Sequence, residues 1–176
     1  MWRSAFAILA ITFMPCGGVP ALVAQQMQHA GPAVPSSSLT IRTGDGKTLV
    51  LSGDELAALP HKSVAVFNEH NQANERYSGV PLSVLLGKVG VPQGDQVRGG
   101  ILTTGIVAEG TDGYKVLYSL AEVDPAIHTG DVIVADTLNG QKLGADGAFK
   151  LVATEDKRPA RWVRNLTTIS VIRVKP

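Results

Sequence analysis

The sequence predicts a single α+β domain built from mixed β-sheets with a few short helices. Short runs that alternate between apolar and polar residues recur between turns rich in Gly, Asn and Asp, and each run suits one strand. Two capping boxes and one apolar segment of helical period predict only two or three short helices. Strands and helices do not alternate regularly, which excludes both a doubly wound parallel sheet and a helical bundle.

The composition is that of an ordinary compact domain. The chain has 176 residues and is 44% hydrophobic, which is enough to bury one core without a disulfide or a metal. Its 16 Lys and Arg are offset by 15 Asp and Glu, which leaves a net charge of +1. A strongly basic nucleic-acid binder is therefore excluded, and we expect no nucleic-acid partner.

Residues 1–24 are expected to be a signal peptide. Arg3 precedes an apolar run from Ala5 to Met14, and a small residue, Ala24, stands at a suitable cleavage position. The run is too short to span a bilayer, so we expect no stable membrane span after cleavage. The alternatives are an uncleaved anchor, a buried first helix, or a lipoprotein acylated at Cys16.

Cleavage after Ala24 would remove Cys16, the only cysteine in the sequence. The mature chain would then have no disulfide and no thiolate. Export without a disulfide predicts a protein of the bacterial envelope, either periplasmic or secreted. Residues 25–38 are polar and contain two prolines, so we expect a flexible leader there. The folded domain is expected at residues 39–176.

The domain is expected to open with a hairpin and a short helix. Strands at 39–42 and 48–51 flank an Asp-Gly turn, which supplies the positive φ that a tight turn requires. Ser52 and Glu55 have the spacing of a capping box, and Pro60 is expected to end the helix that follows.

The next segments predict a strand, a loop and the clearest helix of the chain. Residues 62–67 alternate as in a strand, whereas 68–76 is polar and is expected to be an exposed loop. A helix is expected over 79–90, with Pro81 in its first turn and Gly90 just past its end.

The second half of the domain is expected to consist mainly of strands. A second capping box at 119–122 predicts one more short helix. The apolar runs of this half predict strands at 101–108, 115–118, 132–135, 149–153 and 169–174.

Positive charge is concentrated in the basic segment, residues 157–164. It contains Lys157, Arg158, Arg161 and Arg164, and Trp162 can hold it against the core. Guanidinium groups fixed in this way bind phosphate or carboxylate through paired hydrogen bonds. The alternative is a solvated loop whose charge balances the neighbouring Glu155 and Asp156.

Other common sites are not indicated. The segment Gly46–Thr48 lacks the first glycine of a phosphate-binding loop, and no Gly-x-Ser-x-Gly elbow occurs. The four histidines do not have the spacing of metal ligands, so we expect no dedicated metal site. No catalytic residue can be assigned from the sequence.

An ordered series of segments resembles the sulfite-oxidase-type molybdopterin-binding domain. The resemblance runs from about Ser52 to Val174 in family order and includes the segments 77–86, 112–114, 119–122, 132–136, 138–143, 147–152 and 161–164. It implies a mixed α+β fold and an oxygen-atom or two-electron transfer at a molybdenum held by a pterin dithiolene. It also implies that the basic segment holds the pterin and its phosphate, through Arg158, Arg161 and Arg164.

One departure from the family concerns the metal. In catalytic members a cysteine thiolate from the strand before the Tyr-x-Gly-Val-Pro-Leu segment ligates molybdenum, and residues 63–70 of this chain contain no sulfur. Asn68 and His70 could supply oxygen or nitrogen donors from the same region. The chain also lacks the additional domain with which many catalytic members dimerise, so a stand-alone domain is expected.

Two functions of different classes follow. The first is an exported molybdopterin-binding oxidoreductase with a redox partner in the envelope. The second is a cofactor-free binding module on the same scaffold, which recognises a small anion or a protein partner through its basic segment. The missing thiolate favours the second function, and the retained basic segment favours the first.

Overall fold

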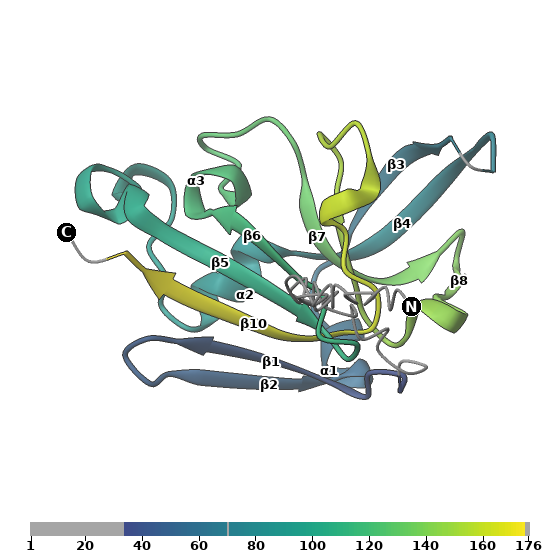
Figure 1. Ribbon diagram of the computed structural model, residues 1–176, viewed down its shortest axis with the longest axis horizontal. Coiled ribbons are helices and arrows are strands. Elements are labelled where there is room, and N and C mark those ends of the chain that lie inside the picture. Colours follow the sequence, from purple (N-terminus) through teal and green to yellow (C-terminus); the bar gives the residue numbers. More distant parts are fainter. Residues whose placement is uncertain (1–33, 70, 175–176) are drawn as a thin grey trace, which may run out of the picture.

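The computed structural model describes residues 34–69 and 71–174 (Figure 1). The predicted signal peptide at 1–24, the leader residues 25–33 and His70 lie outside the described residues. Within the remainder of the expected leader, Ser36 is buried and the first strand begins at Ser38. No helix in the described part of the chain is long and apolar enough to cross a membrane.

The strands form two five-stranded sheets. The first sheet has the order β2-β1-β10-β5-β6, with β1 and β10 parallel and all other neighbours antiparallel. Its strands are β1 (Ser38–Thr43), β2 (Thr48–Ser52), β5 (Thr104–Gly110), β6 (Lys115–Ser119) and β10 (Leu166–Arg173).

The second sheet is antiparallel and has β7 at its centre. Its order is β3-β4-β7, and both β8 and β9 pair with β7 as well. Its strands are β3 (Lys62–Asn68), β4 (Ala73–Pro81), β7 (Val132–Leu138), β8 (Gln141–Lys142) and β9 (Lys150–Ala153).

The helices are few and short. Three are α-helical: α1 (Gly53–Ala57), α2 (Leu82–Lys88) and α3 (Leu120–Val123). Single 3₁₀ turns occupy Gly94–Gln96, Gly99–Thr103, Gly144–Asp146 and Pro159–Arg161. Mixed sheets with a few short helices confirm the predicted α+β class.

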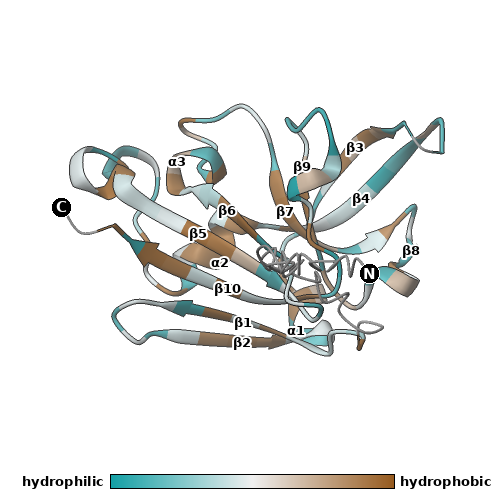
Figure 2. Cartoon of the chain, viewed as in Figure 1, coloured by the Kyte–Doolittle hydropathy of each residue, from teal (hydrophilic) through white to brown (hydrophobic). Residues whose placement is uncertain are grey.

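The core lies on both faces of β7. Val132 and Val134 belong to the larger apolar cluster, between the two sheets and α2, whereas Ile133 and Ala135 belong to a smaller cluster on the opposite face. Trp162 packs against both clusters. Figure 2 shows hydrophobic residues along much of β7, while β4 is hydrophilic toward its hairpin end.

Both predicted capping boxes are present. In the first, the Ser52 hydroxyl accepts from the Glu55 N–H, and the Glu55 carboxylate accepts from the Ser52 N–H at 2.8 Å. The second box joins Ser119 and Glu122 in the same way. These caps form because the Ser and Glu side chains satisfy N–H groups that the first helical turn leaves without partners.

Two predicted boundaries are wrong because strand pairing extends beyond the local pattern, with residues 73–76 paired to β3 and residues 79–81 paired to β7. The expected loop at 68–76 ends at residue 72, since β4 begins at Ala73, and the expected helix at 79–90 begins only at Leu82. Gly79, Val80 and Pro81 instead pair with Ala135, Val134 and Ile133 of β7. Pairing with a buried strand therefore overrides the local helix signal of Pro81.

Smaller corrections concern the strands of the second half. The expected strand at 101–108 starts at Thr104, because residues 99–103 form a 3₁₀ turn. β10 begins at Leu166, three residues before the expected position, and β8 has no counterpart among the predicted strands.

Candidate functional site

A pocket of about 700 Å³ lies between the β3–β4 hairpin and the segment 154–162, which folds over the second sheet. β3 and β4 form one side, and the segment that connects β9 to β10 forms the other. The lining residues are Ala65, Val66, Phe67, Asn68, Glu69, Glu75, Tyr77, Lys150, Thr154, Asp156, Lys157, Arg158, Pro159 and Trp162.

The floor of the pocket is a chain of hydrogen bonds among buried residues. Lys150 Nζ donates to Tyr77 Oη at 3.0 Å and to Asp146 Oδ2 at 2.7 Å. Tyr77 Oη in turn donates to Glu75 Oε2 at 2.9 Å. Glu75 and Lys150 are each only 8% exposed, so both charges depend on these partners.

The environment keeps Glu75 ionised and Tyr77 protonated. Burial raises the pKa of Glu75, but hydrogen bonds from Asn68, Tyr77 and Asn71 and the charge of Lys150 outweigh it, so that its pKa is lowered overall. Burial, followed by the hydrogen bond to Glu75, raises the pKa of Tyr77. The floor therefore presents a fixed carboxylate beside a neutral phenol and an ammonium group.

Aromatic rings surround the ammonium group. Lys150 Nζ lies 4.8 Å from the ring centroid of Tyr77 and 5.4 Å from that of Trp162. The two rings meet edge to face with centroids 5.6 Å apart. Because a ring face attracts a cation, both rings contribute to holding the Lys150 side chain in this position. Phe67, which is 57% exposed, adds a third aromatic side chain to the pocket lining.

Two of the predicted site residues line this pocket. Arg158 and Asn68 lie on opposite sides of it, and Lys157 is next to Arg158. The Asn68 side chain donates to Glu75 Oε1 at 2.7 Å and accepts from the Asn71 N–H at 3.1 Å. Lys157 and Arg158 are exposed, and neither forms an ion pair with any described residue.

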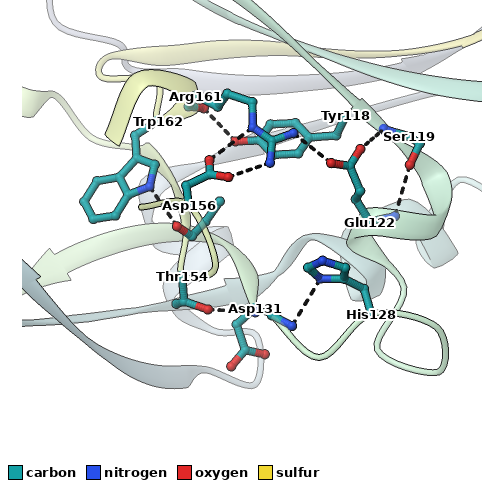
Figure 3. A network of polar contacts seen from close by, with 11 residues as sticks. Tyr118, Ser119, Glu122, His128, Asp131, Thr154, Asp156, Arg161 and Trp162 are labelled. Carbon is teal, nitrogen blue, oxygen red and sulfur yellow. Dashed lines mark hydrogen bonds and ion pairs between the residues drawn. The ribbon is translucent and has the colours of Figure 1, made fainter. Parts of the chain in front are cut away.

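Arg161 lies in an adjacent polar network rather than in the pocket lining (Figure 3). Its Nε and Nη2 donate to the two carboxylate oxygens of Asp156 at 3.1 and 2.5 Å, and its Nη1 donates to Glu122 at 2.8 Å. The hydrogen bonds to Asp156, followed by those to Glu122, raise the pKa of Arg161. Its guanidinium carbon also lies 4.5 Å from the ring centroid of Tyr118.

Further hydrogen bonds hold the same segment in place. Tyr118 Oη donates to the Arg161 carbonyl at 2.7 Å, and Trp162 Nε1 donates to the Ala153 carbonyl at 2.8 Å. Tyr114 Oη donates to the Ala160 carbonyl. Figure 3 shows Tyr118 of β6 and Glu122 of α3 both reaching Arg161, so the outer wall of the pocket has a defined position.

The other two predicted residues lie elsewhere. Arg164 does not line the pocket; its Nε is 3.9 Å from Asp146 Oδ1, and its side chain is largely exposed. His70 lies outside the described residues. Of the five predicted residues, the structure thus brings together Asn68 and Arg158 in one pocket.

Glu75, Tyr77 and Lys150 were not predicted as site residues. Glu75 fell in the expected loop, while Tyr77 and Lys150 were named only within longer segments of the resemblance. Glu75 and Tyr77 pair with Val66 and Val64 and point to one face of the sheet. If a strand had been predicted from residue 73 onward, Glu75 and Tyr77 would have been expected on one face of it, and that spacing is the signal that could have identified them.

The donor atoms of the pocket suit an anionic organic group better than a metal. The lining offers two exposed cations, an amide and a buried ammonium group beside the carboxylates of Glu69, Glu75 and Asp156, but it contains no sulfur. Both oxygens of Glu75 already accept hydrogen bonds. Across the described residues, no group of three or more His, Cys, Asp or Glu side chains is placed to hold a metal ion.

No protein-family model and no curated protein matches the chain. A solved structure with a similar fold is the sulfane dehydrogenase SoxCD from Paracoccus pantotrophus, with 24% identity and a TM-score of 0.60. The match covers 76% of this chain and 37% of that one, so the chain spans well under half of that protein's length. The similarity establishes the fold alone.

Proposed function

We propose that this domain binds the pterin part of a molybdenum cofactor in the pocket between β3, β4 and the segment 154–162. One observation carries the proposal. The strand expected to face the metal and the basic segment expected to hold the pterin are separated by about ninety residues in the sequence, yet both line the same pocket.

The chain's own groups have distinct tasks in this proposal. Arg158 and Lys157 bind the phosphate at the rim, since their charges are not used by other described residues. Lys150 and Asn68 offer donors to the ring system deeper in the pocket. Arg161 holds in place the segment that carries Arg158, through its hydrogen bonds to Asp156. Arg164 has an indirect role, because it lies near Asp146, which is the ion-pair partner of Lys150.

The bound cofactor would supply oxygen-atom or two-electron transfer chemistry. The chain would bind and orient it, and the segment 154–162 would limit access of water. The similarity in fold to a sulfane dehydrogenase supports the proposal that this domain takes part in an oxidoreductase reaction. The expected export then places the protein, and the redox partner it would require, in the bacterial envelope.

The second candidate is a cofactor-free binding module for a small anion or a protein. It is favoured by the absence of sulfur from the pocket lining and by the hydrogen bonds that join Glu75, Tyr77 and Lys150. A floor whose polar groups satisfy one another does not need a cofactor to be stable.

The deciding experiment is the pterin and molybdenum content of protein purified from a host that makes the cofactor. We expect near-stoichiometric pterin, measured by fluorescence after oxidation, and a several-fold reduction in the double variant Lys157→Gln/Arg158→Gln. The matched control is Lys88→Gln/Arg98→Gln, which removes two exposed cations remote from the pocket lining. Folded protein without pterin would overturn the proposal and leave the binding module.

A further inference from the structure

The strand β3 is an edge of the second sheet. It pairs with β4 over residues 62–68, and no other described strand lies against it. Residues 62–67 make no backbone hydrogen bond to any other described segment. The N–H and C=O groups that point away from β4 are therefore available, as at any free sheet edge.

The pocket runs along this free edge. Five successive residues, 65–69, line it. Because successive side chains of a strand point to opposite faces of the sheet, a pocket lined by consecutive residues of β3 includes the backbone edge as well as the face that carries Glu75 and Tyr77. The opposite wall is the segment that contains Lys157, Arg158 and Pro159. Figure 1 shows this segment, between β9 and β10 in the chain, beside β3.

Within residues 34–69 and 71–174, no protective feature lies along the middle of the strand edge. Native edges are commonly shielded by lysines, prolines or bulges. Residues 63–67 include none of these, and Lys62 is held by Asp131 at 2.5 Å. Phe67 adds an exposed apolar side chain to the same stretch. The edge thus combines free backbone groups with an apolar contact.

The opposite wall determines the charge of a suitable partner. Lys157 and Arg158 are exposed and have no carboxylate partner among the described residues, whereas Asp156 is already paired with Arg161. The exposed carboxylate of the lining, Glu69, lies at the hairpin end of β3, across the pocket from these cations. A chain lying between the two walls would bring every second side chain toward these cations. Acidic side chains at those positions would be attracted and basic ones repelled.

We propose that the free edge of β3 is a docking site for an extended, acidic segment of a partner protein, which adds a strand to the second sheet. Backbone hydrogen bonds to residues 62–67 would supply affinity, and Lys157 and Arg158 would select acidic side chains. The proposal goes beyond cofactor binding and does not depend on it.

The test uses the full chain and a seven-residue peptide in which Glu and Val alternate, labelled for fluorescence anisotropy. We expect binding that weakens with added salt, and a loss of roughly tenfold in affinity for Lys157→Gln/Arg158→Gln, as for two exposed charge pairs. The variant Lys88→Gln/Arg98→Gln should bind as the unaltered protein does. The same peptide with Lys in place of Glu should not bind.

Two further measurements separate strand addition from simple charge attraction. Bound peptide should slow amide hydrogen exchange within residues 62–67. Methylating the peptide's backbone nitrogens at one set of alternate positions should abolish binding, while methylating the other set should not, because alternate N–H groups face the edge. Binding without exchange protection, equal effects of both methylations, or no binding would each overturn the proposal.

Pterin content is measured on the same preparations. Protection of residues 62–67 in protein that lacks pterin would sustain the docking site even if the cofactor proposal fails. Because the cofactor phosphate and the peptide would share Lys157 and Arg158, the decisive sample is protein that lacks pterin: if added peptide gives no protection there, the docking site is excluded whatever the pterin content of other preparations.

Discussion

At the scale of single residues, buried charges define the site. Lys150 is enclosed by two aromatic rings and depends on Asp146 for its compensating charge. Among the described residues no cation contacts Glu75 directly, and three neutral donors hold its carboxylate. Both charges are buried, so removing a partner from either one would leave a buried charge without compensation.

Replacing Lys150 with Met should lower the free energy of unfolding by about 3 kcal/mol. The change leaves Asp146 without its close partner and removes a donor from Tyr77, and breaking a buried pair from one side typically has this effect. Urea unfolding measures the change. Lys62→Met, which breaks an exposed pair with Asp131, is the control and should change stability by less than about 1 kcal/mol. Equal effects of the two variants would contradict this account of the floor.

His61 should make stability depend on pH. Its Nδ1 faces the Leu59 carbonyl at 2.7 Å and its Nε2 faces Asp136 at 2.9 Å. Both neighbours are acceptors, so only the doubly protonated ring satisfies both. Burial lowers the pKa of His61, but the hydrogen bonds to Asp136 and Leu59 raise it more, and its net pKa lies above the usual 6.5.

Because the pKa of His61 is higher in the folded protein than in the unfolded chain, the ring adds most to stability at pH values where it is protonated in both the folded and the unfolded protein. The contribution of His61 should therefore be complete below about pH 6.5 and should disappear as pH rises through the higher folded pKa. The measurement is the difference in unfolding free energy between the unaltered protein and His61→Gln across this range. A difference that is constant, or that grows with pH, would show that His61 is not a charged donor.

At the scale of elements, β4 is shaped by a close approach to β7. A Cβ atom placed on Gly79 would lie 2.1 Å from the Val134 carbonyl oxygen, and the strand register shifts between Ser78 and Gly79. The extra residue on β7 at this bulge is Asp136, the partner of His61. The glycine thus allows β4 to reach α2 as a paired strand.

Gly79→Ala should destabilise the protein by about 2 kcal/mol or more, because the backbone of β7 has to move to admit the methyl group. Gly53→Ala is a matched control in α1, where no atom lies within 4 Å of the added carbon. It should leave stability unchanged or raise it by up to about 1 kcal/mol. Thermal or urea unfolding of both variants measures these changes in stability. An alanine at position 79 that left stability unchanged would refute the close approach of β4 to β7.

At the scale of the whole molecule, the two sheets form one cooperative unit. β7 has a cluster of the core on each face, and Trp162 packs against both. The parallel pair of β1 and β10 joins the two ends of the described domain in the first sheet. Trp162 therefore connects the wall of the pocket to the core.

Unfolding in urea should follow a single transition. In a Trp2→Phe background, Trp162 fluorescence reports the wall of the pocket, and far-ultraviolet circular dichroism reports both sheets. We expect the two midpoints to coincide, as for a two-state domain. Loss of the fluorescence signal at lower urea would mean that the segment 154–162 unfolds separately.

Features that depend on close neighbours in the chain could be predicted from the sequence. Both capping boxes, the hairpin at 39–51 and the strand at 62–67 form as expected, because each requires only residues a few positions apart. The absence of sulfur from residues 63–70 is likewise a property of the sequence alone. The same local reasoning failed at Gly79, where pairing with a distant strand decided the conformation.

The sequence by itself determined the α+β class, the short caps and turns, and the basic segment at 157–164. Only the tertiary structure decided which of those charges remain available: Arg161 is taken up by Asp156 and Glu122, while Arg158 is left at the pocket. It also created the floor, since Lys150 meets Tyr77 across 73 positions of sequence. The physical reason is that the burial and pairing of a charge depend on segments that folding brings together. The pattern of neighbouring residues in the sequence does not specify which distant segments these will be.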